Sequence, residues 1–151
     1  MANAHFGHNK ATTEKHNYLI RLLASMKYAF DAEWTAKAHE IAKALNYGWV
    51  MPERLSVVCS WGSKTRRTIA RIHCIGKVMM LGMGQSKSFY VIELISEKFD
   101  KQPEAEQMET IIHELMHIPR TFGGGFRHHD HVCSRNVKSE LERFMSLKGN
   151  V

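Results

Sequence analysis

The residues best able to do chemistry are two histidines and a glutamate in the run His113-Glu114-Leu115-Met116-His117. Residues four apart on a helix lie one above the other on the same face, so both imidazoles can point at one metal ion. Glu114 would then lie beside the metal without binding it, where it can take a proton from a metal-bound water. This spacing is typical of zinc-dependent peptide hydrolysis.

The neighbouring sequence predicts the helix that this spacing needs. Pro103 suits a first helical turn, and the glutamates that follow it suit the positive end of the helix dipole. Pro119 ends the helix just beyond His117. Apolar residues recur at three- and four-residue steps and leave the two histidines off the core stripe: Met108, Ile111, Ile112, Leu115 and Met116. This context favours a metal site over the alternative, a polar helix face with two accidental histidines.

A catalytic zinc usually takes three protein ligands, so one must come from outside the motif. The run Gly123–Gly125 can fold the chain back, because glycine tolerates positive φ, and it is followed by His128, His129 and His131. Metzincin spacing would put the third histidine at position 123, which is glycine, so that class is excluded. A gluzincin would use Glu140. We prefer the histidine cluster, because it is nearer in sequence and because imidazole is a softer ligand than a carboxylate. The residues alone do not decide which of these histidines is the third ligand.

Several segments resemble the phage metallopeptidase family, which occurs in tailed phages and archaea. The similarity runs from Ser63 to about His129, just under half of the chain, and its most specific block is His113–Pro119. The other matching segments are Gly62–Arg66, Ala70–Ile72, Tyr90–Asp100 and Phe122–His129. The family tends to read F-x-G-G-x-R-P-H in the last of these. Its terminal histidine falls on His129, whereas its usual proline is His128 here.

The resemblance implies a zinc peptidase with Zn²⁺ held by His113, His117 and His129, and with Glu114 as general base. Separately from the resemblance, their closeness in sequence to these residues makes Arg127, His128 and His131 candidates to stabilise the oxyanion or to serve as an alternative ligand. By analogy with minimal zincins and SprT-like proteases, a strand beside the motif helix would pair with an extended polypeptide substrate. The candidate residues for that strand are Tyr90, Val91, Ile92 and Glu93. A phage-encoded protein of this kind would act in the host cytoplasm.

Composition predicts a flexible N-terminus over residues 1–12 and a single domain over residues 13–148. We expect no membrane span, no secretory signal, a cytoplasmic location and free thiols at the three cysteines. The pattern predicts an α+β, zincin-like fold with helices over 13–30 and 32–45. A small, mostly antiparallel sheet would follow, with strands over 55–59, 68–75 and 89–96, then the motif helix and a closing helix over 131–148. Residues 78–81 could form either a strand or a helix.

Charge is concentrated in one segment. Residues 54–92 hold seven basic side chains and no acidic one, and so carry the whole net charge of +6. Such a segment can attract nucleic acid or an acidic partner, or it can be a solvated sheet face. The second hypothesis for function is therefore a zinc-stabilised domain that binds nucleic acid or protein, with little or no protease activity.

Overall fold

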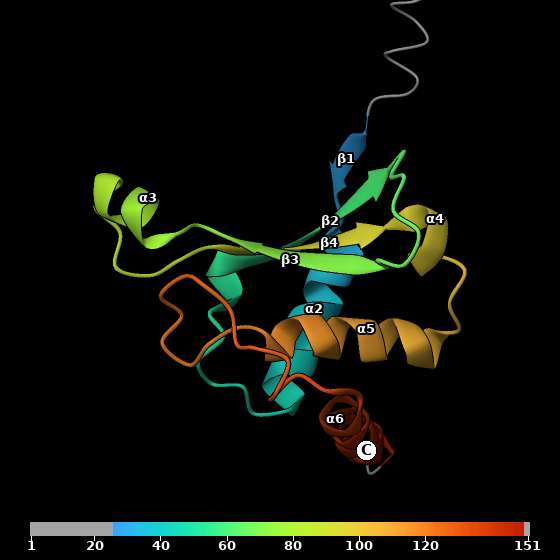
Figure 1. Ribbon diagram of the computed structural model, residues 1–151. Helices are drawn as coiled ribbons and strands as arrows, with labels where there is room; N and C mark the ends of the chain where they lie inside the picture. The colour runs from blue at the N-terminus through green and yellow to red at the C-terminus, as the bar shows by residue number, and fades with distance from the viewer. Residues whose placement is uncertain (1–25, 150–151) are drawn as a thin grey trace, which may run out of the picture.

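The computed structural model describes residues 26–149, and Figure 1 shows a sheet with helices packed below one face. The strands are β1 (Lys27–Phe30), β2 (Leu55–Trp61), β3 (Ala70–Cys74) and β4 (Tyr90–Ile95). The helices are α2 (Ala32–Ala44), the 3-10 turn η1 (Pro52–Arg54), α3 (Lys77–Gly82), α4 (Ser96–Phe99), α5 (Glu104–Met116) and α6 (Ser134–Lys148). The expected α+β class is confirmed.

The sheet is mixed, with strand order β1-β2-β4-β3. The pairs β1–β2 and β3–β4 are antiparallel, as expected, but β2 and β4 run parallel. The parallel pairing arises because β4 enters between β2 and β3 instead of adding to an edge. Its run of mostly apolar residues, Tyr90–Ile95, suits a central strand that is buried on both faces.

The helix predicted over residues 13–30 is wrong in the part that the structure describes. Residues 27–30 form β1, an edge strand on β2, and not the end of a helix over 13–30. Asp31 is the reason: its backbone is extended, and its side chain accepts the backbone N–H of Trp34 at 2.8 Å, so α2 begins afresh there. The remainder of that predicted helix and the N-terminus over 1–12 lie outside the described residues.

The other predicted elements are present with small shifts. The second helix and the three predicted strands are confirmed, and residues 78–81 belong to helix α3. The closing helix begins at Ser134 and not at His131, because Cys133 has an extended backbone. Residues 131–133 therefore continue the loop that follows the motif helix.

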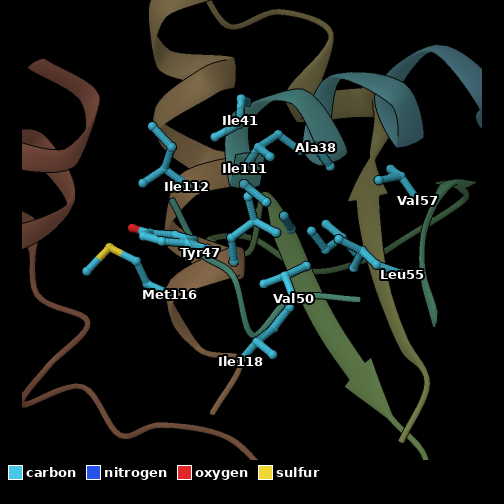
Figure 2. Close-up of a cluster of buried hydrophobic side chains, with 14 of the residues drawn as sticks. Ala38, Ile41, Tyr47, Val50, Leu55, Val57, Ile111, Ile112, Met116 and Ile118 are labelled. Atoms are coloured by element: carbon cyan, nitrogen blue, oxygen red, sulfur yellow. The ribbon is translucent and has the colours of Figure 1, made fainter. Parts of the chain in front are cut away.

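The core lies between the sheet and the helices α2 and α5 (Figure 2). Leu55, Val57 and Ile92 of the sheet belong to this core with Ile41 of α2, while α5 buries the apolar stripe that its sequence predicts: Met108, Ile111, Ile112, Leu115 and Met116. Each such side chain contributes about 1.5–3 kcal/mol when fully buried. Because this stripe fixes the rotation of α5, His113 is turned away from the core.

Candidate metal centre

The two motif histidines meet at the C-terminal end of α5. His117 is the cap residue and keeps helical dihedral angles, so it stays one turn beyond His113. Their Nε2 atoms lie 3.1 Å apart. Two nitrogens on a tetrahedral zinc, each at 2.0–2.1 Å from the metal, would be separated by about 3.3 Å. The spacing therefore fits two corners of such a site.

His129 brings a third imidazole to the same point. Ligand atoms of His113, His117 and His129 all lie within 4.8 Å of one another. The His129 ring centroid is 4.9 Å from that of His117 and 6.1 Å from that of His113. The three side chains could together hold a metal ion, and they leave room for a fourth ligand.

Backbone geometry in the loop after α5 turns His129 back toward the helix. Phe122 has a φ of 50°, which is uncommon for a residue with a side chain, and Gly124 and Gly125 both have a φ of 84°. Phe122 is 1% exposed and packs edge-on against Tyr90, with the two ring centroids 4.7 Å apart. The Tyr90 hydroxyl also donates to the carbonyl of Gly125 at 3.0 Å. The buried strand β4 thus anchors the loop.

Hydrogen bonding sets the orientation of the His117 ring. Its Nδ1 lies 2.8 Å from the carbonyl oxygen of Arg127, which can only accept, so Nδ1 carries the proton. The Nε2 lone pair then faces His113 and His129. A metal-binding histidine usually has such a carbonyl partner, which fixes both its tautomer and its orientation.

Burial favours the neutral form of the two motif histidines, His113 and His117. It lowers the pKa of His113 to about 4, with further lowering from the nearby His117 and His129 rings. Burial also lowers the pKa of His117. Because only a neutral imidazole binds a metal, the lowered pKa values of His113 and His117 favour the form of each ring that can bind one.

Glu114 lines the same cavity as the three histidines. It is 7% exposed, and burial raises its pKa to about 7. No ion pair neutralises it among residues 26–149. A carboxylate with a pKa near neutrality is well matched to accept and return a proton at physiological pH.

Two cavities meet at the histidine cluster. One, of about 560 Å³, runs from His113 and Glu114 toward Arg67 and α6, and the other, of about 500 Å³, runs toward Ile72 and the histidine loop. They share Ala70, His113 and Glu114. We refer to the two cavities together as the groove. Its walls are β3 on one side and α5 on the other.

Comparison with known families agrees with this geometry. A family model described as "Putative phage metallopeptidase" matches residues 26–147. The chain belongs to this family. Searches of curated proteins and of solved structures gave no match.

Within this family member, the remaining candidate residues fall in different places. Arg127 and His128 line the groove, although His128 is not part of the three-histidine group. His131 lines a separate cavity. Glu140 accepts from the Tyr47 hydroxyl and pairs with Arg143, both at 2.6 Å, so it lies apart from the histidine cluster as part of another network.

The residues predicted to pair with a substrate strand lie inside the sheet. Tyr90, Val91, Ile92 and Glu93 belong to β4, whose backbone pairs with β2 on one side and with β3 on the other. No edge of β4 is open to an added strand. The Glu93 carboxylate is 2% exposed and interacts with His73 and Arg71.

The open edge beside α5 belongs to β3. Its ladder with β4 includes hydrogen-bonded pairs at Ile69–Ile95 and Ile75–Phe89. Pairs alternate in an antiparallel ladder, so the backbone N–H and C=O of Ala70 and Ile72 point away from β4. The sequence predicts a strand over 68–75 that contains both residues, but it gives no signal for the strand order that puts them at the edge.

Within residues 26–149, no helix has the length and apolar character needed to cross a membrane.

Proposed function

We propose that this protein is a zinc-dependent peptidase. The observation that carries the proposal is the convergence of three imidazoles with a buried carboxylate that has no ion pair within residues 26–149, in the middle of a groove. His113, His117 and His129 would hold the ion. Zinc, when bound there, would supply a Lewis acid that acidifies water and polarises a carbonyl.

Glu114 is the proposed general base and acid. Its carboxylate takes a proton from the attacking water and returns it to the leaving amine, both of which its raised pKa favours. Arg127 and His128 line the same part of the groove, where a positive or hydrogen-bonding side chain can stabilise the charge that develops on the carbonyl oxygen. His131 is not proposed for this role, because it lines another cavity.

The substrate would be an extended polypeptide paired with β3. The open backbone groups of Ala70 and Ile72 lie along the groove that contains Glu114. A strand added there would pass the histidine cluster with its backbone held by hydrogen bonds. Because backbone hydrogen bonds do not depend on side-chain identity, polypeptides of many sequences could bind in this way.

The direct test is hydrolysis of an unstructured protein such as casein by the purified chain. We expect cleavage that stops on treatment with a chelator and returns when zinc is restored. If the chelated protein cleaves as fast as the untreated one, the proposal is wrong.

A second candidate function is nucleic-acid contact beside the groove. Lys64, Arg66 and Arg67 are exposed in the loop between β2 and β3, and Arg67 lines the groove. Other members of the basic segment are engaged, since Arg54 donates to Gln85 and Arg71 lies beside Glu93. Heparin retention that falls steeply with salt, and that is lost when the three loop residues become glutamine, would support this function.

A further inference from the structure

A third cavity, of about 420 Å³, lies between the segment after α2, the histidine loop and α6. It shares only one lining residue, Arg127, with the groove. The charged side chains of its lining are mostly basic: Arg120, Arg127 and Arg143 lie there with a single carboxylate, that of Glu140, and His131 is a further lining residue.

The Glu140 carboxylate already accepts hydrogen bonds from two other side chains. Arg143 donates to both Glu140 oxygens, at 2.6 and 3.3 Å, and the Tyr47 hydroxyl donates to one of them at 2.6 Å. Figure 2 shows the Tyr47 hydroxyl directed away from the core, and its partner belongs to α6. Glu140 therefore neutralises Arg143 and has little capacity left for the other two guanidinium groups.

Arg120 and Arg127 have no acidic partner within residues 26–149. The Arg120 guanidinium lies over the Trp49 ring, 5.1 Å from its centroid, and that ring stacks on Tyr47 at 4.8 Å. Trp49 is held in turn by a hydrogen bond to the carbonyl of Ile118. These contacts position Arg120 at the cavity wall without cancelling its charge.

We propose that this cavity binds an oxyanion, a carboxylate or a phosphate group, between Arg120 and Arg127. Guanidinium groups present paired N–H donors that match the oxygens of both anions. Arg127 exchanges two hydrogen bonds with His117 and is two residues from His129, so a bound anion would brace the loop that completes the histidine cluster. The anion would be a free one or an acidic group of a polypeptide that reaches past Arg127 from the groove.

The test uses the full chain, freed of metal by chelation and dialysis so that an anion cannot bind through an ion. Inorganic phosphate is titrated while the indole N–H signal of Trp49 is followed by NMR, the signal being assigned by its loss in Trp49→Phe. We expect a saturable shift that weakens about tenfold or more in Arg120→Gln and in Arg127→Gln.

The matched control is Arg135→Gln, because Arg135 is exposed on α6 and lines none of the three cavities. It should leave phosphate binding unchanged. No saturable shift in the parent, or equal weakening in the control, would overturn the proposal. If either Arg120→Gln or Arg127→Gln fails to fold, phosphate binding by the other variant still tests the proposal.

A peptide pair distinguishes the two sources of the anion. A peptide that contains aspartate should displace phosphate, and its asparagine analogue should not, if a polypeptide group occupies the cavity. Phosphate binding that neither peptide disturbs identifies a free anion as the ligand. Because binding is measured without metal or turnover, the result is independent of peptidase activity.

Discussion

His117 and Arg127 are joined by two hydrogen bonds, one from the Arg127 N–H to the His117 carbonyl at 2.7 Å and one between the His117 ring and the Arg127 carbonyl at 2.8 Å. The first fixes the loop against the end of α5, and the second fixes the ring that the helix presents. A single residue of the loop thus sets both the approach of His129 and the orientation of His117.

Removing His129 should abolish tight metal binding. We expect His129→Ala to weaken zinc affinity by more than about 100-fold, because loss of a ligand should cost more than the 10–100-fold typical of losing a ligand's hydrogen-bond partner. His131→Ala is the matched control, since His131 lies outside the cluster and should retain the metal. Metal content of the untagged proteins measures both. Retention of zinc by His129→Ala with loss by His131→Ala would reverse the ligand assignment.

Gly124 should be more sensitive to substitution than Gly125. Both have a φ of 84°, so alanine would strain the backbone equally at either position. Only at Gly124 would the new Cβ lie 2.8 Å from the carbonyl oxygen of Ile75, whereas at Gly125 nothing lies within 4 Å. We expect Gly124→Ala to lose more unfolding free energy than Gly125→Ala, by about 1–3 kcal/mol. Urea unfolding of both variants tests this. Equal losses of unfolding free energy would show that the backbone near Ile75 moves to accommodate the added Cβ.

Glu114→Gln should stop catalysis and leave the metal in place. The amide cannot accept a proton from water, so we expect hydrolysis to fall by about 10²–10⁴-fold. Zinc content should match that of the parent, because Glu114 is not among the three clustered histidines. Turnover at the parental rate would exclude Glu114 as the base.

The same substitution should stabilise the metal-free protein at high pH. The pKa of Glu114 rises from 4.5 to about 7 on folding, so the folded state binds the extra proton between these values and the unfolding free energy falls as pH increases through them. Glutamine does not ionise, so the variant does not lose unfolding free energy in this way as pH increases. We expect Glu114→Gln to be more stable than the parent by roughly 3 kcal/mol at pH 8, with the gain vanishing below pH 4.5.

Urea unfolding of chelated parent and variant at pH 8 and pH 4.5 measures that gain. His113 titrates in the opposite sense, since its pKa falls on folding, but it is present in both proteins and largely cancels in the comparison. A gain of equal size at both pH values would mean that burial of the charge is not its source.

Proline at Ile72 should impair substrate binding along β3. The Ile72 N–H points away from β4, so proline removes a donor at the open edge without breaking the ladder. We expect kcat/KM on a peptide to fall about two- to tenfold relative to Ile72→Ala, which shortens the side chain but keeps the N–H. Equal kcat/KM for the two variants, with zinc content unchanged, would remove β3 from the substrate site.

The sequence by itself determined the motif helix and its immediate chemistry. Pro103, the apolar stripe and Pro119 act through neighbours along the chain, so they predict where α5 begins and ends, and that His113 and His117 share a face. The second helix and the individual strands were predictable for the same reason: their signals are local and periodic.

Only the tertiary structure decided what depends on contacts between distant segments. Spacing alone did not separate His128, His129 and His131, although the family resemblance favoured His129. That His129 lies with His113 and His117 follows from the positive φ of Phe122 and the contacts of the loop with Tyr90 and His117. Strand order is likewise non-local, so it could not be foreseen that Tyr90–Ile95 would lie inside the sheet and that β3 would carry the open edge. Residues 27–30 pair with β2 across a long stretch of chain, and that pairing overrode a helical pattern.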